Sequence, residues 1–339
     1  MNRVSFVPLM GVSGAALFVL GLLSIALGAM PLPIAGVLQA LLDTNGSKTL
    51  TDVQWIVLTE LRLPRTLMAF VVGALLAQCG VIMQGLFRNP LAEPGIVGVS
   101  SGAALGAIVA IVLLPAAWAS WAIPAASFAA GLLCTWLVYR FAQSPYGTSV
   151  LLLLLSGIAV SAFSGAVIGF LTYYTNDQQL RALSLWQMGT FNASEMKQFA
   201  LLVCVALPIS VMFYRKSQAL DALLLGEAEA RYLGIQVENL KKQLVVLCAL
   251  GVGISVAFTG IIGFVGLVVP HLVRMLVGPS HQRVLPLSAL LGGLLLLAAD
   301  LSSRLLIQPA ELPVGILTAM LGGPFFFVLL FKQRKAWQT

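Results

Sequence analysis

The stretch LRLPRTLMAFVVGALLAQCGVIMQGLF, Leu61–Phe87, decides the class of fold. Behind Arg62 and Arg65, no charged residue occurs until Arg88. A run of about 20 predominantly apolar residues is the length that an α-helix needs to cross the hydrocarbon core of a bilayer. The stretch therefore predicts a membrane-spanning helix with two arginines at its mouth.

The composition of the chain supports the same class. Of the 339 residues, 59% are hydrophobic and 9% are charged, and the mean hydropathy is +0.98. Since a soluble domain carries about 25% charged residues, we expect an all-α polytopic membrane protein. The basic residues lie singly at segment ends, which gives no support to nucleic-acid binding. The four cysteines lie in apolar runs without paired spacing and are expected to be small buried residues.

We expect about ten spans. The run from Ser5 up to Asp43 carries no charge before that aspartate and is too long for the core of a signal peptide, so an uncleaved first span is expected. Prolines divide the run 94–139 at LLPAAWASWAIP, and glycines divide the run 243–273 at TGIIGFVG. The expected spans cover residues 7–29, 64–86, 95–114, 121–141, 149–172, 197–215, 243–261, 263–277, 284–303 and 312–331.

The basic residues set the orientation. With ten spans both termini lie on one side, and most of the 19 Lys and Arg residues fall on that side, which the positive-inside rule makes cytoplasmic. Six fall on the outer side: Lys48, Arg62, Arg65, Arg181, Lys197 and Arg304. Arg62, Arg65 and Arg304 stand at span ends against this bias, and they need an explanation. The simplest one is that such side chains snorkel into water.

An internal repeat is indicated by spacing. Gly73, Gly80, Pro90 and Gly98 each recur 180 residues later, as Gly253, Gly260, Pro270 and Gly278. The two sets begin on spans of opposite direction, which predicts an inverted repeat of the kind that many transporters contain.

The longest internal hydrophilic segment runs from Tyr214 to Lys242 and is expected on the cytoplasmic side. Its middle, ALLLGEAEARYLGI, predicts two short helices with a break at Gly226. Short amphipathic helices with several exposed apolar residues suit a groove in a partner protein. The alternative is a helix that lies on the membrane surface.

Four segments resemble the FecCD family, the permeases of ABC importers for iron chelates, haem and cobalamin. They are LGEAEARYLGI, the stretch from LRLPRT to SSGAALG, GFVGLVVPHLVR and ELPVGILTAMLGGPFF. The resemblance implies a single permease domain over residues 1–339 with the BtuC-like fold, in the bacterial inner membrane. It also implies a homodimer, two ATP-binding cassette ATPase subunits and a periplasmic substrate-binding protein as partners.

The resemblance assigns residues 216–242 as the segment that couples the permease to its ATPase. The residues expected to contact the ATPase are Leu225, Gly226, Glu227, Ala228, Ala230, Arg231, Leu233 and Gly234. No G-x-x-x-x-G-K-[ST] motif occurs, so ATP and Mg²⁺ are expected on the partner. We therefore expect a permease that is not itself an enzyme and that binds no cofactor or metal of its own.

The resemblance also gives the outer arginines a role. It implies that Arg62, Arg65 and Arg304 bind acidic residues of the binding protein, for which the planar guanidinium is suited. Asp300 stands four residues before Arg304 on the same expected helix and could pair with it instead.

The translocation path is expected along the fifth span. Its small residues could line a pore, but they would also let helices pack closely. The candidates are Ser156, Gly157, Ser161, Ser164 and Gly165, with Thr148 and Ser149 as candidates for an inner gate.

Haem is the expected substrate, with ferric siderophores or cobalamin as alternatives. The segment NDQQLRALSLWQMGTF resembles the outer loop of haem permeases and predicts a short helix with Trp186 at the interface. His271 and His281 lie in general family motifs, and structural or gating roles are expected for them rather than iron ligation. An ion-coupled secondary transporter is the alternative of a different class, but its coupling acids within spans are nearly absent here.

Overall fold

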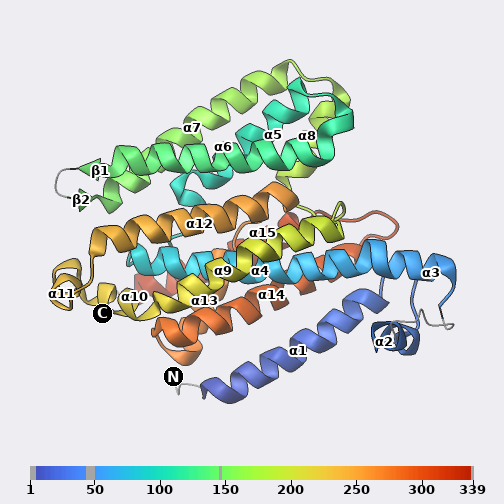
Figure 1. Ribbon diagram of the computed structural model, residues 1–339, viewed down its shortest axis with the longest axis horizontal. Coiled ribbons are helices and arrows are strands. Elements are labelled where there is room, and N and C mark those ends of the chain that lie inside the picture. Colours follow the sequence, from blue (N-terminus) through green and yellow to red (C-terminus); the bar gives the residue numbers. More distant parts are fainter. Residues whose placement is uncertain (1–4, 43–49, 145–146, 337–339) are drawn as a thin grey trace.

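The computed structural model describes residues 5–42, 50–144 and 147–336 and is almost entirely helical (Figure 1). Each of the ten expected spans contains a helix. These helices are α1 (Phe6–Ala26), α4 (Leu63–Leu86), α5 (Val99–Leu113), α6 (Ala119–Ala142), α7 (Val150–Tyr173), α9 (Met196–Arg215), α12 (Val237–Thr259), α13 (Val265–Val277), α14 (His281–Leu305) and α15 (Val314–Ala336). Within the described residues, seven helices are long and apolar enough to cross a membrane, while α5, α13 and the apolar part of α15 are shorter.

The expected breaks and short helices are confirmed. The run 94–139 divides between α5 and α6, and the run 243–273 divides between α12 and α13. The remaining α-helices are α2 (Ile34–Leu42), α3 (Asp52–Ile56), α8 (Asp177–Gln187), α10 (Ser217–Leu225) and α11 (Glu227–Tyr232). A small hairpin of β1 (Gln143–Ser144) and β2 (Gly147–Thr148) precedes α7. Helices α2 and α3 are not among the expected elements.

The helix that carries the arginine pair starts earlier than the sequence predicts. A π-helical turn, Val57–Arg62, joins α3 to α4 in one rod from Asp52 to Leu86. Pro64 lies at the join, where it has no N–H to donate and its ring disfavours a regular α-helical turn behind it. The wider π turn lets the chain continue as a helix through this proline.

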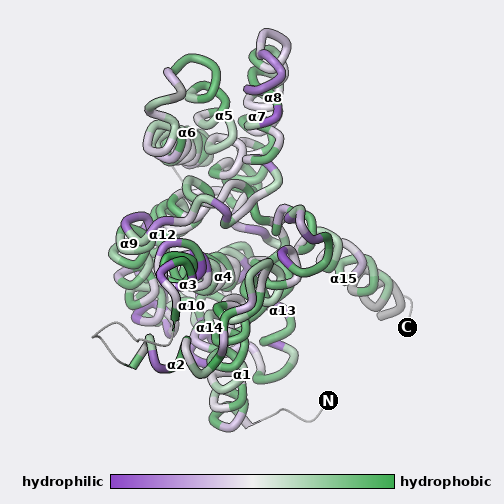
Figure 2. The backbone as a smooth tube through the Cα atoms, turned by 90° about the vertical axis from the view of Figure 1, so that its right-hand side faces the viewer, coloured by the Kyte–Doolittle hydropathy of each residue, from purple (hydrophilic) through white to green (hydrophobic). Residues whose placement is uncertain are grey.

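Helix α4 lies at the centre of the fold. In the most apolar part of the rod that contains α4, 78% of the residues are buried. The corresponding share is 17% for α7 and 28% for α6. Helices α9, α12, α13 and α14 surround it, and α5, α6 and α7 form a separate layer beside α12 (Figure 1). Helix α15 projects away from this body and is mainly hydrophobic where coloured (Figure 2). The large apolar side chains Phe163 on α7 and Phe327 on α15 are about two-thirds exposed, which fits lipid or a second subunit beside them.

The helix pairing supports the inverted repeat. Helix α4 packs on α14, while α12, its counterpart in the second half, packs on α6, the counterpart of α14. The constant spacing of 180 residues extends only over α4 and α12. Pro90 lies in the long loop before α5, whereas Pro270 lies inside α13, because the connection 87–98 is longer than the connection 260–264.

Glycines allow α4 to approach its neighbours closely. A Cβ atom at Gly73 would overlap the carbonyl oxygen of Gly292 on α14, and one at Gly80 would overlap the carbonyl oxygen of Gly266 on α13. In a membrane, where apolar lipid competes with apolar side chains, such close backbone contact is a main source of helix association.

We predict that Gly73→Val destabilises the protein by about 1–3 kcal/mol or more, because two backbones would have to separate. The matched control is Gly165→Val on α7, where a Cβ atom meets no described atom within 4 Å. The midpoint of thermal unfolding in detergent measures both variants. Equal midpoints for the two variants would contradict this packing.

Candidate functional site

The three outer arginines lie together at the α3 end of the bundle, and all three are nearly buried. Arg62 donates from Nη1 to the carbonyl oxygens of Ile25 at 2.7 Å and Ala26 at 2.9 Å, and from Nη2 to Met30. Arg304 donates from Nη1 to the carbonyl oxygen of Ser24 at 3.1 Å. The carbonyl groups of Ser24, Ile25 and Ala26 are the last three of α1 and have no partner within their own helix, while Met30 lies just beyond it.

Arg62 and Arg304 therefore act as caps for the C-terminus of α1. A cation is favoured there by the helix dipole as well as by the free carbonyl groups. Arg304 Nη2 also donates to Ser24 Oγ at 2.7 Å, and Ser24 Oγ lies 2.9 Å from Thr66 Oγ1 on α4. The two arginines thus hold the first span against the central helix, which is a more specific role than snorkelling.

Arg65 has different partners. Its Nε donates to Asp300 Oδ1 and its Nη1 to Glu311 Oε2, both at 2.8 Å. The expected pair of Asp300 and Arg304 is also present, with Arg304 Nη2 3.2 Å from Asp300 Oδ2. Asp300 is fully buried, so its charge depends on these two arginines.

One donor in this cluster has no partner among the described residues, namely the buried Nη2 of Arg65. Arg62, Arg65, Arg304 and Glu311 line one recess of about 390 Å³ at this end of the chain. Nη2 of Arg65 has almost no accessible surface, so a carboxylate in the recess would accept a hydrogen bond from it only if the recess opened, whereas most donors of Arg62 and Arg304 are already used. Binding-protein docking by the three arginines stays a prediction, and the geometry favours Arg65 most.

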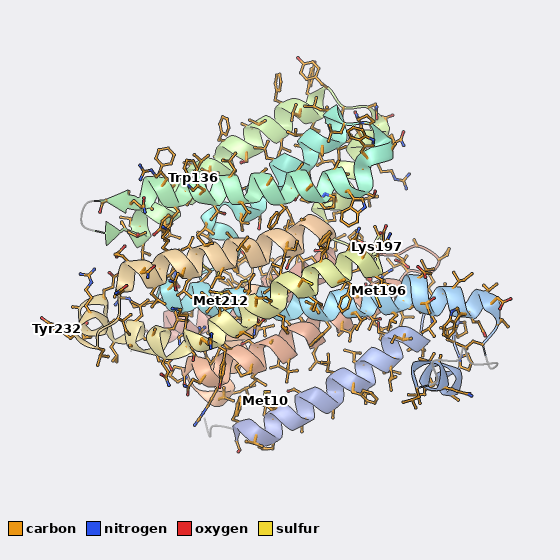
Figure 3. All side chains as sticks on the ribbon, in the orientation of Figure 1. Met10, Trp136, Met196, Lys197, Met212 and Tyr232 are labelled. Atoms are coloured by element: carbon orange, nitrogen blue, oxygen red, sulfur yellow. The ribbon has the colours of Figure 1, made fainter. Side chains whose placement is uncertain are left out.

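At the opposite end of the bundle, α10 and α11 form the two short helices that the sequence predicts. The break lies at Gly226, whose φ of 137° is unfavourable for any residue with a side chain. Leu225, Leu233 and Tyr232 are 64–92% exposed, and Tyr232 stands at the outer edge of the structure (Figure 3). Of the other expected contact residues, Ala228, Arg231 and Gly234 are exposed, Glu227 is half-buried, and Gly226 and Ala230 are buried.

Lys241 joins these short helices to the predicted gate. It lies on α12 and is only 3% exposed. Its Nζ lies 2.7 Å from Glu227 Oε1 on α11 and donates to the carbonyl oxygen of Thr148 at 3.1 Å and to Glu238 Oε1 at 3.1 Å. Glu238 Oε2 in turn accepts from the backbone N–H of Thr148 at 2.7 Å. One lysine and one glutamate therefore hold both backbone groups of the hairpin residue that precedes α7.

A second link ties α10 to α14. Asp221 Oδ1 accepts from the backbone N–H of His281 at 2.9 Å and lies 2.6 Å from its Nδ1, and Ser280 Oγ donates to Asp221 Oδ2 at 3.2 Å. Burial raises the pKa of Asp221, but the hydrogen bonds from His281 and Ser280 outweigh it and hold the pKa below its ordinary value. Ser280 stands at the N-cap position of α14 but its side chain accepts no hydrogen bond from the first turn. Asp221 caps α14 instead, by accepting from the N–H of His281.

The predicted path residues divide into two groups. Gly157 faces the carbonyl oxygen of Ile96 too closely for a side chain, Ser164 is fully buried, and Ser161 Oγ lies 3.0 Å from Ser101 Oγ. These positions pack α7 against its neighbours. Gly165 is exposed, and Ser156 is half-buried.

Ser149 caps α7 by accepting from the backbone N–H of Leu152. Thr148, the other gate candidate, is nearly buried beside Tyr139. Lining and gating by the predicted path residues stay predictions.

The two histidines pack within the fold, and the expectation that all four cysteines are buried is wrong for Cys204. His281 is fully buried on Asp221, and His271 meets the ring of Phe325 edge-on. The described residues contain no group of three or more His, Cys, Asp or Glu that could hold a metal ion. Three cysteines are buried and Cys204 is exposed, and none is paired.

Sequence reasoning missed Lys241, Glu238 and Asp221 as site residues. Lys241 and Glu238 lie three residues apart at the end of an expected span, where charges are ordinary. The run from Glu227 to Lys242 combines opposite charges at helical spacing, which is visible in the sequence. The contact of Glu238 and Lys241 with Thr148 is not visible there, because Thr148 lies in a hairpin about 90 residues earlier.

Residues 16–332 match the model of the FecCD transport family. The chain belongs to the FecCD transport family. It is 43% identical over 321 residues to the hemin transport system permease protein HmuU of Yersinia pestis, covering 93% of this chain and 96% of that one. It is 41% identical over 276 residues to the vitamin B12 import system permease protein BtuC of Citrobacter koseri, covering 81% and 83%.

A solved structure, a metal-chelate type ABC transporter in an inward-facing conformation, matches with a TM-score of 0.84 at 34% identity, over 95% of this chain and 98% of that one. The chain is therefore a multi-pass membrane protein and the permease subunit of an ABC importer.

Proposed function

We propose that this permease moves haem across the bacterial inner membrane into the cytoplasm. Haem is chosen as the substrate because the chain is similar to the hemin permease of Yersinia pestis over almost the full length of both chains. Vitamin B12 permeases match over a shorter part of the chain at similar identity, so cobalamin is the second candidate. Ferric siderophores stay a third. Haem is the cargo here and needs no resident site in this chain.

A homodimer is the proposed working unit. The exposed apolar faces of α7 and α15 support this, because contiguous exposed apolar surface of this kind suits a subunit contact as well as lipid. The α11 end would face the cytoplasm, as would both termini, in keeping with the positive-inside rule. An ATPase subunit would bind each copy of the exposed surface formed by Leu225, Tyr232 and Leu233.

The contacts of Lys241 support a route from the ATPase to the gate. A movement of α11 would pull Glu227, the lysine would follow its ion pair, and the hairpin at Thr148 would move with it. Asp221 and His281 would carry the same movement from α10 into α14. Both routes rely on short, partly buried contacts, which resist separation more than exposed ion pairs do.

An ion-coupled transporter stays the alternative of a different class. The observation in its favour is Glu93, which lies in the connection before α5 and accepts from the backbone N–H of Phe264 at 3.4 Å in the interior. Dependence of uptake on ATP separates the two mechanisms.

The first prediction concerns the substrate. Proteoliposomes with the permease, its ATPase and its binding protein should accumulate haem only when ATP is present, and unlabelled haem should compete whereas cobalamin and ferric siderophores should not. Accumulation driven by an ion gradient without ATP would contradict the importer mechanism. Competition by cobalamin alone would contradict the substrate.

The second prediction concerns coupling. Lys241→Met should uncouple the complex, so that ATP is still hydrolysed but haem uptake falls by roughly tenfold or more, because Thr148 loses its link to α11. Lys241→Arg keeps the charge and should restore part of the uptake. Arg215→Met, which removes an exposed positive charge at the same end of the bundle, is the matched control for transport. Normal uptake per ATP in a folded Lys241→Met variant would contradict the route.

The third prediction concerns docking. Arg65→Gln should weaken binding of the periplasmic protein by at least about tenfold, since a buried charge that pairs across an interface is costly to remove. Glu311→Ala should not weaken it, because it removes the acceptor of Arg65 Nη1 and so frees a second donor. Gln308→Ala in the same recess is the control. A folded Arg65→Gln variant with unchanged affinity for the binding protein would contradict docking at this arginine.

A further inference from the structure

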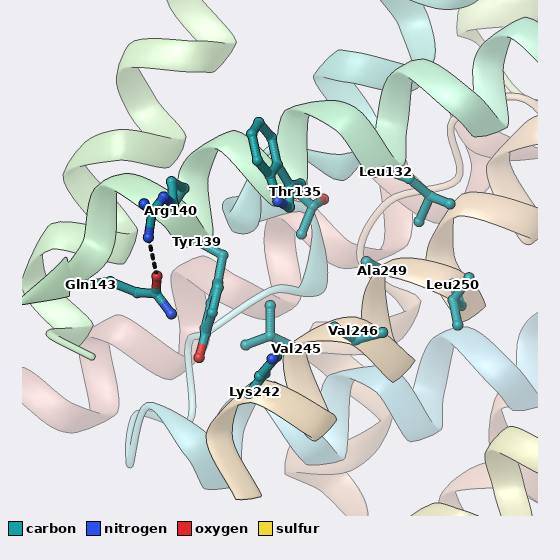
Figure 4. A pocket seen from close by; sticks show the side chains of 11 residues that line it. Leu132, Thr135, Tyr139, Arg140, Gln143, Lys242, Val245, Val246, Ala249 and Leu250 are labelled. Carbon is teal, nitrogen blue, oxygen red and sulfur yellow. Dashed lines mark hydrogen bonds between the residues drawn. The ribbon is translucent and has the colours of Figure 1, made fainter. Parts of the chain in front are cut away.

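A groove between α6 and α12 lies outside the elements used so far. It has a volume of about 610 Å³ and is open to one side of the chain (Figure 4). Aliphatic side chains from both helices form its walls. They are Leu132, Val245, Val246, Ala249 and Leu250. Such a surface suits hydrocarbon rather than a polar solute.

One end of the groove is cationic and aromatic. Arg140 on α6 and Lys242 on α12 line this end together with Tyr139, which extends from α6 towards α12 (Figure 4), and Trp136 also lines the groove. Arg140 donates to Gln143 at 3.2 Å, and neither cation has a carboxylate at ion-pair distance within the described chain. Trp136 is 59% exposed on the flank of α6 (Figure 3). Tryptophan and basic residues in this combination are typical of the level of lipid headgroups.

The polar end continues into a second recess of about 530 Å³, which is lined partly by the same residues and by Gly147, Thr148 and Glu238. Glu238 would repel an anion, but its carboxylate already receives hydrogen bonds from Lys241 and the backbone of Thr148. The cations at the boundary of the two recesses are thus left to attract negative charge.

The dimensions fit one leaflet of a bilayer. From Leu132 to Gln143 an α-helix extends about 16 Å, which is about half of a hydrocarbon core of roughly 30 Å. Arg140 lies near the C-terminal end of α6 and Lys242 near the N-terminal end of α12, and both line the same end of the groove, so the two helices run antiparallel along it. The charged end is the end of the bundle that carries α11 (Figure 1).

From this arrangement we propose that the groove binds an anionic phospholipid, with its acyl chains along α6 and α12 and its phosphate between Arg140 and Lys242. The bound headgroup would lie beside the hairpin that carries Thr148, so the lipid would steady this hairpin. The inference rests on the proposed transport function only for the choice of the cytoplasmic leaflet and for the role of the hairpin.

Native mass spectrometry of the purified full-length protein tests the site without any transport step. Added phosphatidylglycerol should remain bound at lower lipid concentration than phosphatidylcholine with the same chains. The double variant Arg140→Gln/Lys242→Gln should lose this preference, with retention of phosphatidylglycerol reduced roughly tenfold or more, since each basic residue near an anionic headgroup contributes to binding. Arg215→Gln/Arg283→Gln removes two exposed charges at the same end and should keep the preference.

A second variant tests the apolar half. Val246 is 49% exposed in the groove, so Val246→Trp fills it without removing a buried residue and should also reduce retention. Equal retention of the two lipids by the wild type, or equal losses in the test and control pairs, would overturn the proposal. So would a disulfide-linked dimer of Val246→Cys, which would place a second copy of this chain in the groove. Loss of lipid preference with normal haem uptake would overturn only the role of the hairpin.

Discussion

A bilayer interior offers no water to buried charges and free backbone groups, so this chain must satisfy them within itself. It does so in two places. At the α3 end, Arg62 and Arg304 take up the last carbonyl groups of α1, and Arg65 neutralises Asp300 and Glu311. At the α11 end, Lys241 is neutralised by Glu227 and Glu238. The close glycine contacts of α4 hold the body between these two clusters.

This constraint explains why the same residues serve structure and function. A charge that caps α1 cannot also be fully available to another protein, and of the three arginines only Arg65 has a buried donor without a partner in the described part of the chain. A lysine that holds the hairpin at Thr148 must be shielded from water to hold it firmly, which is why Lys241 is nearly buried although it lies near a helix end. In the proposed lipid groove the charges are not neutralised within the described chain, because Arg140 and Lys242 have no carboxylate at ion-pair distance there. An anionic headgroup would neutralise them instead.

The sequence was sufficient for the features that depend on local pattern. Long uncharged runs predicted each spanning helix, the glycines of TGIIGFVG predicted the division of α12 and α13, and Gly226 predicted the break between α10 and α11. Features that depend on distant contacts could not be predicted in the same way. The acceptors of Arg62 are backbone carbonyls 36 and 37 residues earlier, for which no side chain gives a signal. The small residues of α7 looked alike in sequence, and only packing separates Gly157 from Gly165.

The central claim is that α11 and the hairpin that carries Thr148 move as one body because Lys241 binds both. The most direct measurement is the distance between spin labels at Tyr232 and Gln143, both exposed, in the assembled importer with and without ATP. A rigid link predicts one narrow distance distribution that stays the same in both states and broadens in Lys241→Met. A wild-type distance that changes by as much as one helical turn, about 5 Å, between the two states would contradict it.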